Sequence, residues 1–192
     1  MSRRKWPHWG GLQVNIPMWM VDWQHECCGP QMAVTDTVDL SVVSYPEQLA
    51  PILTRDAPSV TVYDDDAVEI VGDCIGPVYQ EGNLASYVVS AGSLHVGLPA
   101  DYGTLPVGRV CFRGKLWVDR HEHATLSSTV GQLVSIGWHA AITRETGPRS
   151  SEIVGYAEGI PIRSTEERTS VQPRRTFSWA YRLMVDVALT SS

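Results

Sequence analysis

The sequence predicts an all-β fold with very little helix, built as a small barrel or as two packed barrels of the SH3-like or OB-like type. Apolar residues recur at a period of two along several segments, which is the pattern of strands with one buried face. Turn-forming residues separate these segments, as at Asp64–Asp66 and at Gly147 and Pro148. A hydrophobic fraction of 43% and a charged fraction of 19% suit a chain that folds around a core.

The longest predicted strand runs from Thr176 to Thr190, where the alternation is clearest. Its apolar parity holds Phe177, Trp179, Tyr181, Leu183, Val185, Val187 and Leu189. Its polar parity holds Ser178, Arg182 and Asp186. One face of this strand is therefore predicted to be buried.

Two further long strands are predicted at residues 107–123 and 130–142. The first has an apolar face of Val110, Phe112, Leu116 and Val118, opposite Arg109, Arg113, Lys115 and Asp119. The second has an apolar face of Val134, Ile136, Trp138, Ala140 and Ile142. Shorter strands are expected at 14–23, 34–43, 59–63, 67–71, 86–96 and 152–157, with Asp64–Asp66 as a hairpin loop between two of them.

Helix is expected at one place. Ser44 and Glu47 have the Ser-x-x-Glu spacing of a capping box, in which each side chain satisfies a backbone N–H at the start of a helix. Pro51 follows soon after and cannot continue a helix. One or two helical turns are therefore predicted in this segment.

The chain is expected to consist of a flexible N-terminal arm, residues 1–11, and a single β domain, residues 12–192, which could divide into lobes at 12–100 and 101–192. The arm carries basic residues with Trp6 and Trp9. It is either a binding tail or a frayed terminus that rests on the body. The polar segment 164–175 is expected to be an exposed loop or a lid.

Charge and hydropathy restrict the partners. The net charge of −6 gives no overall attraction to nucleic acid. No apolar run approaches the roughly 20 residues of a spanning helix, and the N-terminus lacks the apolar core of a signal peptide. We therefore expect a cytoplasmic protein with a protein or small-molecule partner and no membrane. In that compartment its four cysteines are expected to be thiols or metal ligands.

The segment after the first strand has the most unusual composition in the chain. Trp19, Trp23 and Gln24 lie within it and are predicted to form a binding surface. His25 and Cys27 would point to one side of a continuing strand, and Cys28 is adjacent. Thiolate sulfur and imidazole nitrogen are the ligands that zinc prefers, so this group is half of a candidate metal site.

His121 and His123 are the second half of that candidate, because residues two apart on a strand face the same way. Together with His25, Cys27 and Cys28 they would form a mixed Cys/His site for zinc or iron. The alternative is that the cysteines are small buried residues at a strand end. The two histidines would then be exposed, because they share the polar parity of their strand.

Motifs of the common catalytic systems are absent. The sequence holds no Gly-x-Ser-x-Gly elbow, no phosphate-binding loop, no dinucleotide-binding glycine pattern and no His-Glu-x-x-His. Asp64–Asp66 lacks the alternation of a calcium loop. No catalytic residue is assigned, and the sequence does not decide whether the protein is an enzyme.

One family resemblance can be stated. The run from Trp23 to Gly29, followed by Val34–Val38, resembles an uncharacterised bacterial family that carries Trp-Gln, then Cys-Cys-Gly, then Val-Gly-Asp-x-Val. Thr35 stands where that family has glycine. Residues 114–121 are also similar to a later segment of the family. The resemblance implies a self-contained domain and no particular activity.

Two functions of different classes follow. The first is a non-catalytic binding protein that uses the Trp23–Gly29 segment and the open end of a barrel as its contact surface. The second is a zinc or iron metalloprotein, with its metal held by the mixed Cys/His group.

Overall fold

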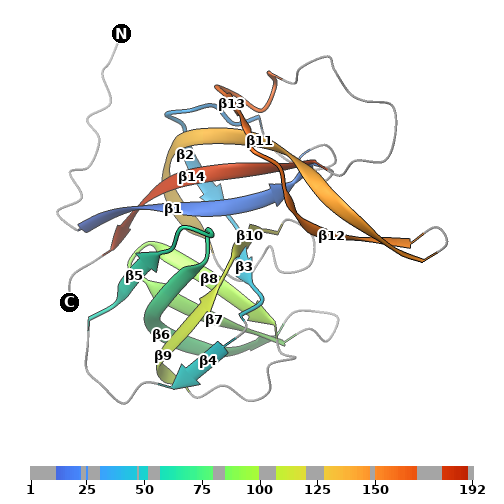
Figure 1. Cartoon of the computed structure of the whole chain (residues 1–192). Helices are drawn as coiled ribbons and strands as arrows, with labels where there is room; N and C mark the ends of the chain where they lie inside the picture. Colours follow the sequence, from blue (N-terminus) through green and yellow to red (C-terminus); the bar gives the residue numbers. More distant parts are fainter. Residues whose placement is uncertain are drawn as a thin grey trace, which may run out of the picture.

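A computed structural model of the chain describes residues 12–22, 25, 31–46, 48–51, 57–79, 85–99, 107–119, 128–147, 150–167 and 179–189. Every element named in this part of the chain is a strand, which confirms the all-β prediction (Figure 1). The strands are β1 (Leu12–Val21), β2 (Thr37–Leu40), β3 (Val42–Ser44), β4 (Gln48–Pro51), β5 (Ser59–Val62), β6 (Val68–Tyr79), β7 (Ala85–Ala91), β8 (Leu94–Pro99), β9 (Gly108–Gly114), β10 (Leu116–Val118), β11 (Thr129–Gly147), β12 (Ser150–Tyr156), β13 (Ile160–Ile162) and β14 (Trp179–Leu189). The predicted arm, residues 1–11, lies outside the described residues.

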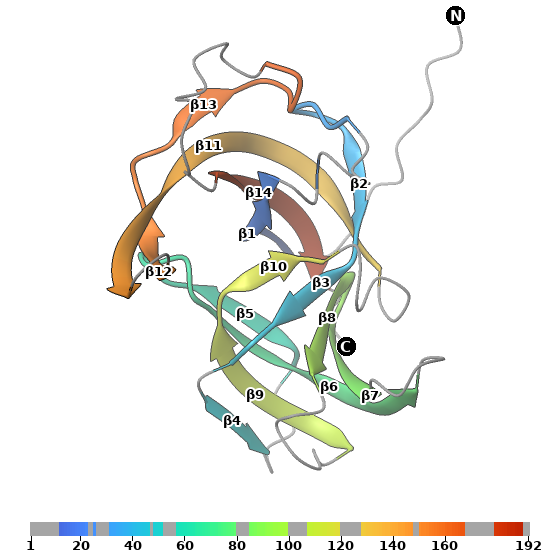
Figure 2. The same cartoon turned by 90° about the vertical axis from the view of Figure 1, so that its right-hand side faces the viewer.

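The strands form one hydrogen-bonded sheet in the order β12-β11-β14-β1-β10-β3-β8-β7-β6-β9-β4. This order is open at both ends, so it does not establish the predicted barrel. An upper group, β12 to β10, and a lower group, β8 to β4, are joined through β3 (Figures 1 and 2). β3 pairs with β10 on one side and with β8 on the other. Strands from the two halves of the chain interleave, because β9 lies in the lower group and β1 in the upper.

The core follows the predicted alternation in β14, β9 and β10. The apolar parity of β14 is buried, at no more than 4% exposure from Tyr181 to Leu189. Across the change from β9 to β10, Phe112 and Leu116 are buried while Arg113 and Lys115 are exposed. A fully buried side chain of this size stabilises the fold by about 1.5–3 kcal/mol, so the alternation fixes which face of each strand is inward.

β11 departs from its predicted parity. Of the five residues expected on its apolar face, only Ile136 and Trp138 are buried. The pairing with β14 shifts register between Leu133 and Ser135, which is a β-bulge. The shift turns Leu133 inward and leaves Val134 42% exposed.

The predicted helical turn after Ser44 is wrong. Residues 48–51 form β4, which pairs with β9 so that Leu49 lies opposite Phe112. The Ser44 hydroxyl donates to the Lys115 carbonyl oxygen at 2.9 Å and is therefore not used as a helix cap. A tertiary hydrogen bond thus replaces the local one that the capping-box spacing indicates.

A reciprocal pair of hydrogen bonds also connects the two groups of strands. Thr129, at the start of β11, is fully buried. Its hydroxyl accepts from the His95 backbone N–H at 2.9 Å and donates to the His95 carbonyl oxygen at 2.8 Å. β8 of the lower group is thereby held against β11 of the upper group.

In the described part of the chain, no helix has the length and apolar character needed to cross a lipid bilayer.

Thr35 occupies a backbone conformation that favours glycine. Its φ is +83°, within the tight turn that joins Ala33 to Asp36. The Asp36 carboxylate accepts from the Ala33 N–H at 2.7 Å, and the Thr35 N–H donates to the Leu133 carbonyl oxygen at 2.8 Å. These bonds hold a β-branched residue in the left-handed region, where its side chain is strained.

We predict that Thr35→Gly raises the free energy of unfolding by about 0.5–1 kcal/mol, because relief of the strain exceeds the entropy cost of glycine. Urea denaturation of the full chain measures this. Thr61→Gly is the matched control, since Thr61 is an exposed strand residue that lacks positive φ, and it should lower the stability instead. An unchanged or lower stability for Thr35→Gly would contradict the strain argument.

Candidate functional site

The strand register places four residues side by side on the outer face of the upper group. Gly137 of β11 lies opposite Arg182 of β14, which lies opposite Trp19 of β1, which lies opposite Trp117 of β10. Residues in register on neighbouring strands share a face of the sheet. This face is opposite to the core, because the neighbours of Trp19 and Arg182 along their strands are buried core residues.

An aromatic cluster is built on this row. The Tyr156 ring, at the end of β12, stacks on the Trp19 ring with centroids 4.7 Å apart and planes 21° apart. The His139 ring meets the Trp19 ring edge-on at 5.0 Å. The Trp117 ring is tilted, 6.4 Å from both Trp19 and Tyr156. This packing leaves Trp19 only 5% exposed although it lies on the outer face, and burial raises the pKa of Tyr156, so its phenol is neutral at physiological pH.

His139 is held in one orientation. Its Nδ1 lies 2.8 Å from the Ala157 carbonyl oxygen, which can only accept a hydrogen bond. Nδ1 therefore carries a proton and donates this hydrogen bond. Two glycines make room for the ring: an added Cβ would lie 2.7 Å from Nε2 at Gly137 and 2.2 Å from it at Gly159.

The turn between β5 and β6 reaches the same row through an ion pair. The Arg182 Nε donates to Asp66 Oδ2 at 2.7 Å, and Nη2 donates to Oδ1. The two side chains are 30% and 15% exposed, respectively. The hydrogen bonds to Asp66 raise the pKa of Arg182, against the opposing effect of burial. Asp66 has a φ of +63°, a conformation that aspartate tolerates better than most residues.

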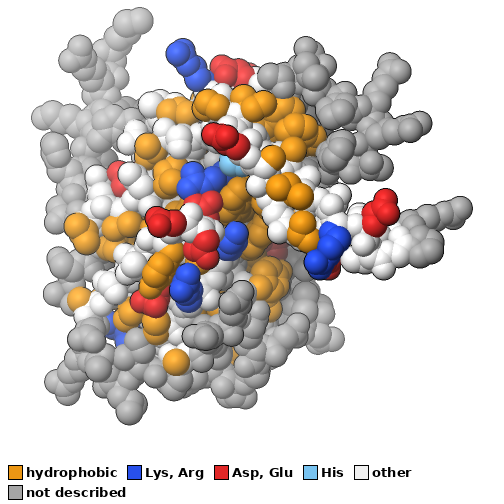
Figure 3. Space-filling model, viewed as in Figure 1, with side chains coloured by type: hydrophobic (Ala, Val, Ile, Leu, Met, Phe, Trp, Pro, Cys, Tyr) orange, Lys and Arg blue, Asp and Glu red, His pale blue; other side chains and the backbone are white. Residues whose placement is uncertain are grey.

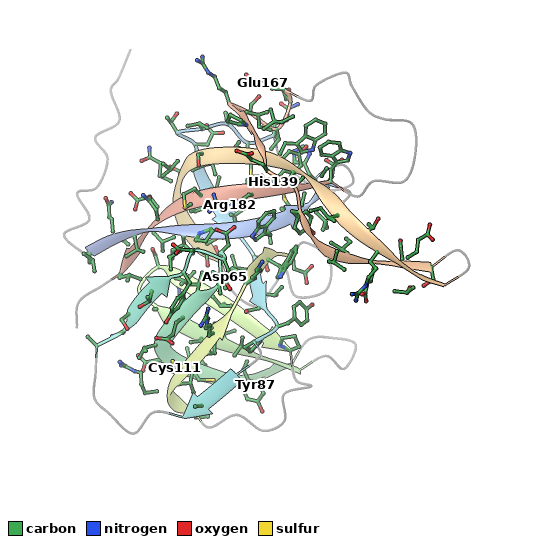
Figure 4. The ribbon with its side chains drawn as sticks, in the orientation of Figure 1. Asp65, Tyr87, Cys111, His139, Glu167 and Arg182 are labelled. Carbon is green, nitrogen blue, oxygen red and sulfur yellow. The ribbon has the colours of Figure 1, made fainter. Side chains whose placement is uncertain are left out.

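These features border an open cavity of about 770 Å³. It is bounded by the aromatic cluster, the Asp64–Asp66 turn and the segment that leaves β12. In Figure 4, His139, Arg182 and Asp65 gather in the middle of the molecule around this space. The lining residues are Trp19, Val21, Asp64, Asp65, Asp66, Lys115, Trp117, His139, Ile153, Val154, Gly155, Tyr156, Ala157, Glu158, Gly159 and Arg182.

A second hollow of about 430 Å³ adjoins the cavity and shares Asp65, Lys115 and Trp117 with it. Tyr45, which is 53% exposed, lines the second hollow only. Figure 3 shows basic and acidic side chains interspersed with hydrophobic ones in the middle of this face. Together the two hollows form a groove that is lined by aromatic residues and has both signs of charge at its rim.

The groove is lined by aromatic, aliphatic and charged side chains. None of the lining residues in the described part of the chain is serine, threonine or cysteine. The Trp19 Nε1 is buried and has no hydrogen-bond acceptor among the described residues. A buried donor without a partner costs about 1–3 kcal/mol.

Of the predicted binding residues, Trp19 lies in the cavity wall. Trp23 and Gln24 lie outside the described residues. The contribution of those two residues to binding therefore stays a prediction.

Of the predicted metal ligands, only His25 is described. It is 9% exposed, and its ring centroid lies 5.3 Å from that of Tyr181 in the core. Cys27, Cys28, His121 and His123 lie outside the described residues, so the mixed Cys/His site stays a prediction. Among the residues that the structure describes, no three His, Cys, Asp or Glu side chains are grouped to hold a metal ion.

The residues that build the cavity were not predicted to do so, apart from Trp19. Asp66 looked like part of an ordinary hairpin loop, and Arg182 like a solvated residue. One signal was available for Trp117. It shares the polar parity of its strand with Arg113 and Lys115, and a large aromatic residue in that position indicates a second packed surface.

We predict that Gly159→Ala destabilises the chain by about 1–3 kcal/mol in urea denaturation, because the added Cβ would displace the His139 ring and break its hydrogen bond to Ala157. Gly155→Ala is the control, since a Cβ there meets nothing within 4 Å. In a His139→Ala background the Gly159→Ala penalty should fall below about 0.5 kcal/mol. An equal penalty in both backgrounds would show that the ring is not what Gly159 accommodates.

Comparison with known proteins gives one positive result. No curated protein and no solved structure matches the chain significantly. One family model matches residues 14–187, a range that contains all the residues lining the cavity. Its description is "Family of unknown function (DUF6578)". The chain therefore belongs to this uncharacterised family.

Proposed function

We propose that the protein is a non-catalytic binding protein that holds an organic ligand in the cavity beside Trp19. The observation that carries this proposal is the convergence of four ring side chains, from β1, β10, β11 and β12, on one cavity of about 770 Å³. This volume lies within the range of about 300–1,000 Å³ that is typical of small-molecule sites. The predicted contact surface at Trp23–Gly29 is not needed for this proposal.

The lining of the cavity supports a ligand with a flat, partly apolar face. Trp117 and Tyr156 are both partly exposed and are not stacked on each other, since their planes are 51° apart. Trp117 and the face of Tyr156 that is not stacked on Trp19 can therefore contact a ligand. Arg182 uses Nε and Nη2 for Asp66, and Nη1 has no partner among the described residues, so it can donate to the ligand. A few polar groups set among aromatic rings are what orients a bound molecule.

The polar groups of the cavity support binding rather than catalysis. Two of its carboxylates are engaged with arginine: Asp66 with Arg182, and Asp65 with Arg113 at 3.6 Å. A nucleophile activated by His139 would need a hydroxyl or thiol nearby, and the described lining offers neither except the Tyr156 phenol.

We predict that a library of flat aromatic and heterocyclic fragments, screened by ligand-observed NMR, yields binders that are lost in Trp117→Ala. The reason is that truncation removes the ring shared by both hollows. Val130→Ala is the control, because Val130 is exposed and lines neither hollow. Trp117→Phe, which keeps a ring, should restore part of the binding. Binders that Trp117→Ala retains in full would place the site elsewhere and overturn the proposal.

A further inference from the structure

The charges at the rim of the groove are nearly balanced and largely paired. Its carboxylates are Asp64, Asp65, Asp66 and Glu158, and its cations are Arg113, Lys115 and Arg182. Two of the carboxylates form ion pairs with Arg182 and Arg113. An ionic ligand of either sign would therefore meet like charges as well as opposite ones. The rim is suited to a neutral molecule that both donates and accepts hydrogen bonds.

Donors and acceptors both line this groove. Arg182 Nη1 and the Lys115 ammonium can donate. The carboxylate oxygens of Asp64 and Asp65 have lone pairs left to accept. A hydroxyl group satisfies both kinds of partner at once, because it donates one hydrogen bond and accepts two. A ligand with several hydroxyl groups would thus satisfy the rim without carrying a charge.

The aromatic residues of the groove are suited to the other surface of such a ligand. A pyranose ring has an apolar face of axial C–H groups and an edge of hydroxyls, so it packs on an aromatic ring while its edge faces polar groups. Trp117 lies between the two hollows, with Tyr156 on one side and Tyr45 on the other. Each hollow alone has the volume of a ligand site, so the groove has room for a sugar unit on each side of Trp117.

We infer that the groove binds a neutral oligosaccharide, with one sugar unit in the cavity, packed against Trp117 beside Tyr156, and the next in the adjoining hollow that Trp117 and Tyr45 line. This inference rests on the proposed function and names the class of its ligand. The charge pairing at the rim is the argument that the ligand is neutral. The three aromatic residues Tyr156, Trp117 and Tyr45 are the argument that it has at least two sugar units.

The test is a glycan array of neutral oligosaccharides of one to six units, probed with the full chain and followed by isothermal titration calorimetry of the best binder. Affinity should rise with length from one unit to at least two. Trp117→Ala should weaken binding of every length by at least about tenfold, as expected for a central anchoring ring. Tyr45→Ala should weaken the longer ligands several-fold and leave the shortest unchanged. Val130→Ala should change the affinity for neither the shortest nor the longer ligands.

The salt dependence of binding gives a readout that a folding defect would not mimic. Affinity for a neutral sugar should change less than about twofold between 50 and 500 mM sodium chloride, because no charge is neutralised on binding. Circular dichroism and thermal melting check that each variant is folded, and Trp117→Tyr should recover part of the affinity.

Three outcomes would overturn the inference. Fragments could bind in a Trp117-dependent way while no neutral glycan binds at millimolar concentration, which would leave the proposed function standing and remove the sugar. Charged peptides could bind instead, with strong salt dependence, which would assign the groove to a protein partner. If neither fragments nor glycans bind in a Trp117-dependent way, the proposed function fails together with the inference.

Discussion

The ion pair between Asp66 and Arg182 is the contact on which the cavity depends. It joins the β5–β6 turn of the lower group to β14 of the upper group, and so brings the turn over the outer face of the sheet. Its bidentate geometry fixes the direction of the turn as well as its distance. Because both side chains are more than two-thirds shielded from solvent, the pair is screened less than an ordinary surface salt bridge. The pair therefore holds one wall of the cavity against the sheet.

The position of Arg182 is in turn fixed by the core. A slip of β14 by one residue against β1 would turn Tyr181 outward and Arg182 inward. That slip is prevented because the apolar parity of β14 is fully buried from Tyr181 to Val187. The same register sets Trp19 beside Arg182 and Trp117 beside Trp19. Packing on the inner face of the upper strands thus positions the cavity-lining residues on their outer face.

Much of the fold could be predicted, because alternation is a local property of each strand. The sequence placed Arg182 on the outer parity of β14 and selected Trp19 as a binding residue. It could not pair Asp66 with Arg182, which is 116 residues away, because strand order is a property of the whole sheet. The bulge in β11 could not be predicted from the sequence either, since a bulge shifts the parity of a strand without requiring a distinctive residue. The Ser44 capping signal failed for a related reason, as its hydroxyl found a partner across the sheet.

The most direct test of this account is a double-mutant cycle of Asp66→Asn and Arg182→Gln, measured by urea denaturation of the full chain. If the pair holds the turn against the sheet, the coupling energy should be about 1–3 kcal/mol, above the roughly 0.2–1 kcal/mol of an exposed salt bridge. A coupling below about 0.3 kcal/mol would contradict the account. The turn would then be held by something other than Arg182, and the cavity would not owe its wall to this ion pair.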